Sequence, residues 1–370
     1  MRPLPPHLKH SAMASTAPES GETAHSGPDR LLVDAADVAR HADARLSAAL
    51  NDLFMPDFVR PTDSQRTAMA NMLSALVEEI EHDLRHALVQ RLGETAPPVL
   101  GVTRIPIVRP IFDRAGVLRD RDLVSLLLTR VEEHRITSGL RRVAEFQPEF
   151  APTLAPSGQT GWEAAMLVAE GRRHGPSGEP RLAKADLSAE LLHRMLWWAA
   201  AALRDYLERT SELDPATRDE ALSVAVAAQL VGHDEGQTLE AAAMRAALAS
   251  RGGDDQLFEA FRVGRFSLFV AVIAVRARLD FSPAFLMASD PSIGALAVLL
   301  RAVDVSTEVA APILLQMAAV NGVGDAKLEE RIGDFLDLEL SAAHDAIRPW
   351  RLDRAFRNAI VDIGRERRQR

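Results

Sequence analysis

Apolar residues recur at steps of three and four along most of the chain, which is the spacing of one face of an α-helix. The clearest unit runs from residue 104 to 134, RIPIVRPIFDRAGVLRDRDLVSLLLTRVEEH. It carries two apolar stripes: Ile105, Val108, Ile111, Phe112 and Ala115, then Leu123, Leu126, Leu127 and Val131. Gly116 ends the first predicted helix, and Asp120 and Asp122 can cap the second. Two short amphipathic helices cannot bury both stripes alone, so the unit predicts a stack of neighbouring helices.

The same spacing predicts helices on both sides of this unit. Before it we expect one helix over 31–54, which Pro56 stops, and another over 63–92 with a break near 79–83, because so long a run exceeds one repeat helix. After it the expected helices are 187–209, 215–231, 235–250, 254–278 with a break near Gly264, 282–302, 305–320 and 325–346. No stretch alternates with period two. The expected fold class is therefore all-α.

Three stretches resemble a known family. They are the unit at 104–134, the block DLSAELLHRMLWWAAAALRDYL from Asp186 to Leu207, and the block from Leu257 to Ser306 that contains LFEAFRVGRFSLFVAVIAV and DPSIGALAVLLRAVDVS. In order and spacing they are similar to the alphaproteobacterial domain of unknown function 2336 (DUF2336), over about residues 60 to 320. The resemblance implies a HEAT-like N-terminal half. Because the family has no established activity, it implies no catalytic residue, cofactor or substrate.

Composition divides the chain further. Residues 1–28 hold almost no apolar residues and are expected to be a disordered tail, since they cannot offset the entropy of ordering. Prolines and glycines mark 146–185 as a partly ordered junction. With the resemblance, this predicts a HEAT-like array over 31–145, a C-terminal helical domain over 186–347, and a basic amphipathic terminal helix and tail over 348–370.

Bulk properties exclude several classes of function. The chain has 370 residues, 47% of them hydrophobic and only 5% aromatic, which suits helix packing. It has no Cys, which rules out disulfides and thiolate nucleophiles. A net charge of −9 argues against nucleic-acid binding. The longest apolar run, Phe266 to Val275, is too short to span a membrane and predicts a buried helix. We expect a cytoplasmic location.

Candidate catalytic and metal-binding patterns are weak. His82 and His86 share a helix face but lack a third ligand, so a solvated face is expected. The segment NGVGDAK at 321–327 lacks the full phosphate-loop spacing and reads as a helix end followed by a cap at Asp325. Adjacent glutamates at 132–133 and at 329–330 point about 100° apart on a helix. We expect both glutamate pairs to be solvated and predict no catalytic, cofactor-binding or metal-binding residue.

Two features favour binding to another protein. Trp197 and Trp198 are adjacent on one helix and cannot both face the same core, so one can anchor a partner, although both rings packed inside is the simpler alternative. The last segment, 348–370, holds eight Arg against three acidic residues. Arg351, Arg354 and Arg357 gather on one face of its predicted helix, which can bind a partner or dock on the acidic body of its own chain.

The expected function is a noncatalytic helical-repeat adaptor or regulator that binds another protein, with a homodimer as a further possibility. The alternative is a small-ligand sensor with a pocket in the C-terminal helical domain. Six phenylalanines motivate this alternative, although they are expected first of all to form the core of that domain: Phe258, Phe261, Phe266, Phe269, Phe281 and Phe285.

Overall fold

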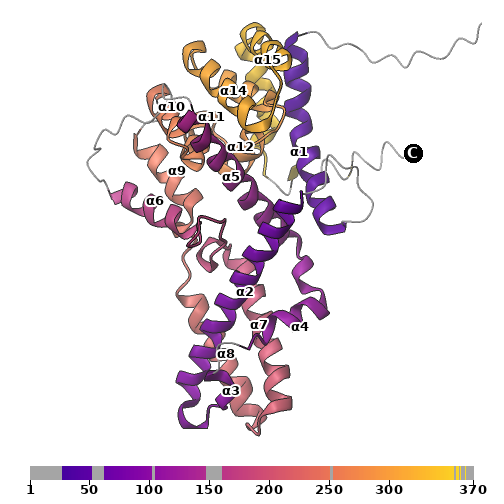
Figure 1. Ribbon diagram of the computed structural model, residues 1–370, viewed down its shortest axis with the longest axis vertical. Helices are drawn as coiled ribbons and strands as arrows, with labels where there is room; N and C mark the ends of the chain where they lie inside the picture. Colours follow the sequence, from indigo (N-terminus) through magenta and orange to yellow (C-terminus); the bar gives the residue numbers. More distant parts are fainter. Residues whose placement is uncertain are drawn as a thin grey trace, which may run out of the picture.

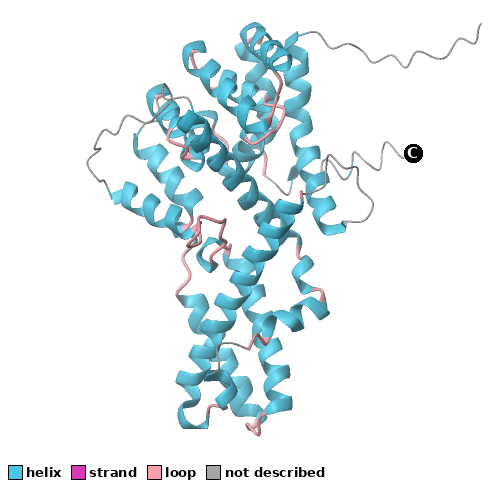
Figure 2. Ribbon diagram, in the orientation of Figure 1, coloured by secondary structure: helices cyan, strands magenta, loops and turns pink. Residues whose placement is uncertain are grey.

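The computed structural model describes residues 27–51, 62–101, 105–146, 161–250 and 253–353, with a few positions up to 363. In these ranges the chain forms helices and no β-strand (Figures 1 and 2), apart from an isolated bridge between His174 and Pro180. The expected all-α fold is confirmed. Among the described helices, none combines the length and apolarity that crossing a membrane requires.

The described ranges contain the following α-helices in chain order. Their bounds are α1 Gly27–Asn51, α2 Asp63–Leu92, α3 Pro98–Gly101, α4 Val108–Ala115, α5 Arg121–Phe146, α6 Gly161–Arg172, α7 Ala189–Thr210, α8 Pro215–Val231, α9 Leu239–Ser250, α10 Asp254–Arg262, α11 Phe266–Ala277, α12 Phe281–Ala288, α13 Gly294–Ala302, α14 Thr307–Asn321, α15 Asp325–Asp337 and α16 Leu340–Ile347.

Two hydrophobic cores organise these helices. The lower core in Figure 1 is built by α2, α3, α4, α7, α8 and the first half of α5. The upper core is built by α1, the second half of α5, α6 and all helices from α9 to α16. The helix α5 belongs to both, since Leu123 and Leu127 lie in the lower core and Ile136 and Leu140 in the upper core. It therefore connects the two halves of the molecule.

The helices do not group by the sequence ranges that we predicted. The first helix, α1, packs on α13 and α15, whereas α7 and α8 pack on α2 in the lower core. The contact of α1 with α13 is close, because a Cβ atom on Gly294 would lie 2.5 Å from Oδ2 of Asp34. The predicted limits of the junction, at residues 146 and 186, stay predictions. Residues 1–26 of the predicted tail and residues 147–160 of the predicted junction lie outside the described residues.

The unit at 104–134 forms the predicted helix pair, α4 and α5. Gly116 ends α4 in the left-handed region at φ 69°, where glycine carries no steric cost. Oδ1 of Asp120 accepts hydrogen bonds from the backbone N–H groups of Asp122 and Leu123, both at 3.0 Å. Asp120 therefore caps α5, as the sequence indicated.

The predicted break near 79–83 is wrong, because α2 is continuous. Two charged residues at this place in α2, Glu81 and Arg85, are each 4% exposed and pair with one another at 2.9 Å. The Glu81 carboxylate accepts from the N–H groups of Ile107 and Val108, and the Arg85 guanidinium donates to the carbonyl of Leu100. This buried pair fastens the segment between α3 and α4 to α2.

The C-terminal region has more breaks than the sequence suggested. The prediction of a single helix over 282–302 is wrong, because a turn separates α12 from α13. In that turn Asp290 accepts from the Ser292 hydroxyl at 2.5 Å, and Ile293 adopts a φ of 58°. The predicted break at Gly264 is confirmed between α10 and α11. The phenylalanines pack in the upper core as expected, with Phe261 and Phe269 ring centroids 4.8 Å apart.

Candidate functional site

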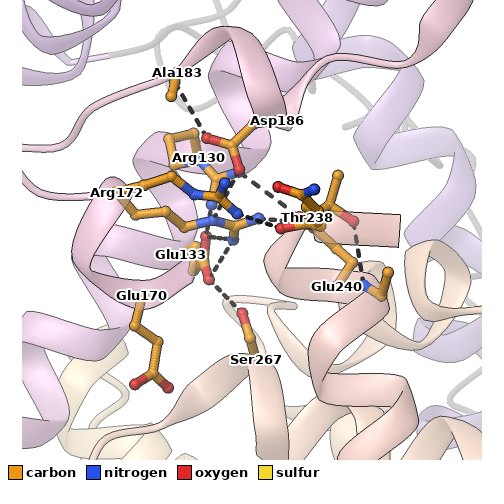
Figure 3. A network of polar contacts seen from close by, with 12 residues as sticks. Arg130, Glu133, Glu170, Arg172, Ala183, Asp186, Thr238, Glu240 and Ser267 are labelled. Carbon is orange, nitrogen blue, oxygen red and sulfur yellow. Dashed lines mark hydrogen bonds and ion pairs between the residues drawn. The ribbon is translucent and has the colours of Figure 1, made fainter. Parts of the chain in front are cut away.

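A network of buried charged side chains lies between the two cores (Figure 3). Its members are Arg130 and Glu133 of α5, Arg173 just after α6, Asp186 before α7, and Glu240 of α9. Arg130, Glu133, Arg173 and Asp186 are at most 7% exposed. Burying a charge is costly unless it is paired, so these side chains depend on one another.

Glu133 is the centre of this network. Nη1 of Arg173 donates to both of its carboxylate oxygens, at 2.8 and 2.6 Å, and the Arg130 guanidinium and the Ser267 hydroxyl also donate to it. On the other side, Nη2 of Arg173 donates to Glu240 at 2.5 Å. Asp186 lies 3.6 Å from Nε of Arg173. The contacts join α5, α9, α11 and the segment between α6 and α7.

The network favours the ionised forms of Glu133, Glu240 and Arg173. Burial acts to raise the pKa values of Glu133 and Glu240, but the guanidinium groups of Arg173 and Arg130 outweigh it, so both pKa values are lowered, that of Glu240 to about 2. Burial acts to lower the pKa of Arg173, and the surrounding carboxylates raise it instead. A carboxylate with a lowered pKa is a poor proton acceptor at neutral pH. The arrangement suits holding segments in place better than transferring protons.

The expectation that the pair at 132–133 is solvated is wrong. Glu132 and Glu133 are 5% and 7% exposed. They do point apart, since Glu132 pairs with Arg135 at 2.7 Å whereas Glu133 enters the network. The sequence held no signal for this burial, because Arg173 and Ser267 lie 40 and 134 residues away along the chain.

A small cleft of about 40 Å³ opens beside the network. It is lined by one face of α5, the end of α6 and the segment after it, the turn before α11, and the start of α11. The rings of His134 and His174 lie 5.9 Å apart in its wall. Burial, and then the neighbouring His174 and Arg141, lower the pKa of His134. The guanidinium of Arg265 forms two hydrogen bonds with Glu170, at 2.8 and 3.1 Å.

The two predicted tryptophans lie in different surroundings. Trp197 is 42% exposed, and its Nε1 donates to Nε2 of His193 at 3.1 Å. Trp198 packs against the lower core, with its ring edge-on to Phe112 at 6.5 Å. The Trp197 ring is thus available at the surface. That it binds a partner stays a prediction.

The predicted basic residues contact their own chain where they are described. Nε of Arg351 donates to the carbonyl of Ala277 at 3.1 Å. The Arg357 guanidinium lies 5.5 Å from the Trp350 ring centroid and donates to the Trp350 carbonyl at 2.8 Å. Arg354 lies outside the described residues. These contacts belong to the upper core, away from the two tryptophans of the lower core.

The weak metal and phosphate patterns have structural explanations. His82 and His86 are exposed on α2. The described part of the chain holds no group of three or more His, Asp and Glu side chains placed to bind a metal ion. Gly322 ends α14 at φ 68°, as predicted. The predicted cap at Asp325 is wrong, because Gly324 is the N-cap of α15 and Asp325 is its first helical residue.

An exposed apolar face lies on α6, inside the region that we predicted to be a junction. Met166 and Ala169 are buried in the upper core. On the opposite side Leu167 and Val168 are 53% and 63% exposed. Their exposed neighbours along this face are small residues: Ala164, Ala165 and Gly171. We call these five residues the outer face of α6; the run AAMLVA, apolar on every side of the helix, was the signal for it in the sequence.

Comparison with known proteins identifies one family. A family model for DUF2336, described as an uncharacterised protein conserved in bacteria, matches residues 161–348. No curated protein and no solved structure matches the chain. The matched region begins with α6 and includes Arg173, Asp186, Glu240 and Ser267 of the network, whereas Arg130 and Glu133 precede it.

Proposed function

The chain belongs to the DUF2336 family, and from this premise we propose that it is a noncatalytic adaptor or regulator that binds another protein through the outer face of α6. The exposure of this face carries the proposal. A helix that is apolar on all sides is normally buried on all sides. In α6 one side is buried by the upper core, and the other leaves Leu167 and Val168 more than half exposed.

The form of the face indicates the partner's chemistry. Ala164, Ala165 and Gly171 are small and let another backbone approach closely, while Leu167 and Val168 project between them. None of these five side chains carries a charge. The partner that fits is an apolar helix on another protein, which would bury the two projecting side chains in its groove.

Two further expectations support this proposal. We propose that α4 and α5 are one HEAT-like unit, because Phe112 of the first stripe and Leu127 of the second pack into one core with α2 and α7. We also propose a cytoplasmic location, based on the absence of Cys. The noncatalytic assignment is supported by the network, in which the Ser267 hydroxyl donates to Glu133 and Glu133 also pairs with Arg130 and Arg173.

The test places a photoactivatable cross-linking residue at position 168 of the full-length chain in its native cell. Position 231 serves as the control, because Val231 is 88% exposed but lies on α8. We expect one protein to be cross-linked from position 168 and not from position 231. Cross-linking only to a second copy of the chain, or to nothing, would overturn the proposal.

The identified partner is then purified and its affinity measured. Leu167→Asp with Val168→Asp should weaken binding by about tenfold or more, since a charge would enter an apolar interface. Val231→Asp should leave the affinity unchanged within about twofold. An equal affinity for the wild type and the double variant would contradict binding through α6.

A small-ligand sensor is the second candidate, and the cleft beside the network favours it. The cleft lies along α5, the helix that contributes to both cores, so its occupancy can affect both halves of the molecule. Native mass spectrometry of gently purified protein separates the candidates: a bound small molecule supports the sensor, and the bare chain mass supports the adaptor.

A further inference from the structure

We infer that the cleft beside the buried network binds a tetrahedral oxyanion, either free phosphate or the phosphate group of a small metabolite. Six of the side chains that line it are basic residue types, against two carboxylates. The basic members are Arg130, His134, Arg141, Arg173, His174 and Arg265, and the carboxylates are Glu133 and Glu170. Asp186 and Glu240 also pair with Arg130 and Arg173. The cleft is therefore a local concentration of hydrogen-bond donors whose arginine charges are largely balanced by carboxylates.

Most of these charges already have partners, and Arg141 is the exception. Arg130 and Arg173 pair with Glu133, and Arg265 pairs with Glu170. Among the described residues no carboxylate lies within ion-pair distance of Arg141, and its side chain is exposed at the rim of the cleft. A guanidinium that has no carboxylate partner and lies at a cleft lined by other donors is available to hold an anion bidentately.

The turn before α11 makes room for this arginine. Gly264 adopts a φ of 70°, and a Cβ atom on it would lie 3.0 Å from Cγ of Arg141. The absence of a side chain at this position therefore lets the stem of Arg141 lie against the turn. The helix that follows, α11, has no side-chain cap at its first turn, and its positive end adds to the favourable potential for an anion.

Buried nitrogen atoms without partners provide a second, independent indication. Nε of Arg130 and Nδ1 of His134 are buried and have no hydrogen-bond partner. Both residues line the cleft, and Arg130 is 2% exposed. A buried polar group without a partner costs about 1–3 kcal/mol, so a site with such groups favours a ligand rich in acceptors. An oxyanion would also offset the effect of His174 and Arg141, which together with burial lower the pKa of His134.

The size of the cleft limits the ligand. About 40 Å³ accommodates roughly three water molecules, since one water needs about 10–15 Å³ of such volume. The oxygens of one phosphate group fill a comparable space, whereas a nucleotide or a larger coenzyme does not fit. Any further part of the ligand must extend outward past Arg141 into solvent.

The experiment titrates the purified full-length chain with inorganic phosphate by calorimetry, at constant ionic strength maintained with chloride. Arg141→Gln tests the site, and Arg142→Gln is the matched control, because Arg142 is the next residue of α5 and is exposed but does not line the cleft. We expect saturable binding to the wild type and a loss of about tenfold or more in affinity for Arg141→Gln. Arg142→Gln should change the affinity by less than about twofold.

Titration of His134 by NMR supplies a second readout. The groups that face its ring are Arg141 and Glu133 of α5 and His174 of the segment after α6. A bound anion should raise the pKa of His134 in phosphate relative to chloride, because it stabilises the imidazolium form. A sugar phosphate in place of phosphate distinguishes the two sources: tighter binding shows that the phosphate is carried by a metabolite, and weaker binding shows that it is free.

Three results would overturn the inference. Calorimetry could show no saturable binding of either phosphate or sugar phosphate to the wild type. Arg141→Gln and Arg142→Gln could lose affinity equally, which would reveal general attraction to a basic surface. The pKa of His134 could also be the same in phosphate and chloride, which would place any bound anion elsewhere on the molecule.

Discussion

Glu133 keeps its charge inside the protein because donors from three segments reach its two oxygens. Arg130 precedes it by one turn of α5, Arg173 follows α6, and Ser267 begins α11. A charge with so many partners specifies the relative position of the segments that supply them. The buried pair of Glu81 and Arg85 does the same for α2 and the segment before α4.

The pH dependence of stability tests the network at Glu240. The pKa of Glu240 falls from 4.5 to about 2 in the folded protein. Ionised Glu240 therefore stabilises the fold, with its full contribution present above pH 4.5 and lost as the pH falls toward 2. We expect Glu240→Gln to lower the free energy of unfolding at pH 7 by at most about 3 kcal/mol. Denaturant titrations of both proteins from pH 7 to pH 3 should show this difference shrinking below pH 4.5. A difference that stays constant with pH would contradict it.

Removing one partner from the Glu81–Arg85 pair should be costly. Glu81→Leu leaves Arg85 buried without its carboxylate and frees the N–H groups of Ile107 and Val108. We expect a loss of about 3–5 kcal/mol in the free energy of unfolding, measured in urea. Glu329→Leu is the control, because Glu329 is exposed on α15 and should change stability by less than about 0.5 kcal/mol. Equal effects of the two substitutions would contradict the role given to the pair.

At the scale of elements, the sequence predicted where the helices lie along the chain better than it predicted which helices pack together. The bounds of α8 agree with the predicted 215–231, and the cap at Asp120 and the end at Gly116 were evident from local chemistry. The burial of Glu133 and the contact of α1 with α13 could not be predicted from local sequence, because they depend on residues far away along the chain. Helix period and caps are local properties, whereas the choice of packing partner is not.

The packing of α5 on α14 gives an element-scale prediction. A Cβ atom on Gly139 of α5 would lie 2.7 Å from Cγ1 of Val320, so Gly139→Ala should separate the two helices. Although alanine favours a helix by about 1 kcal/mol, we expect a net loss of about 1–3 kcal/mol in stability. The control Gly333→Ala, in α15 with open space around it, should be stabilising. Thermal unfolding would show melting temperatures that move in opposite directions; a shift in the same direction would contradict this packing.

At the scale of the whole molecule, the shared helix α5 predicts cooperative unfolding. Trp198 reports on the lower core and Trp350 on the upper core. In two variants that each keep only one of these tryptophans, fluorescence should show the same unfolding midpoint in denaturant, because neither core is complete without α5. Two separate midpoints would show that the cores unfold independently.

The contact of α1 with α13 also has a consequence for synthesis of the chain. The ribosome releases α1 first, but α13 begins 243 residues after α1 ends. At about 5–20 residues per second, α1 waits tens of seconds for its partner. During that time the stripe of Leu31, Ala35 and Val38, fully covered in the finished protein, has no cover from the helices that bury it. The newborn chain must be kept from aggregating until its C-terminal third arrives, and a product that ends before α13 lacks the two helices, α13 and α15, on which α1 packs most extensively.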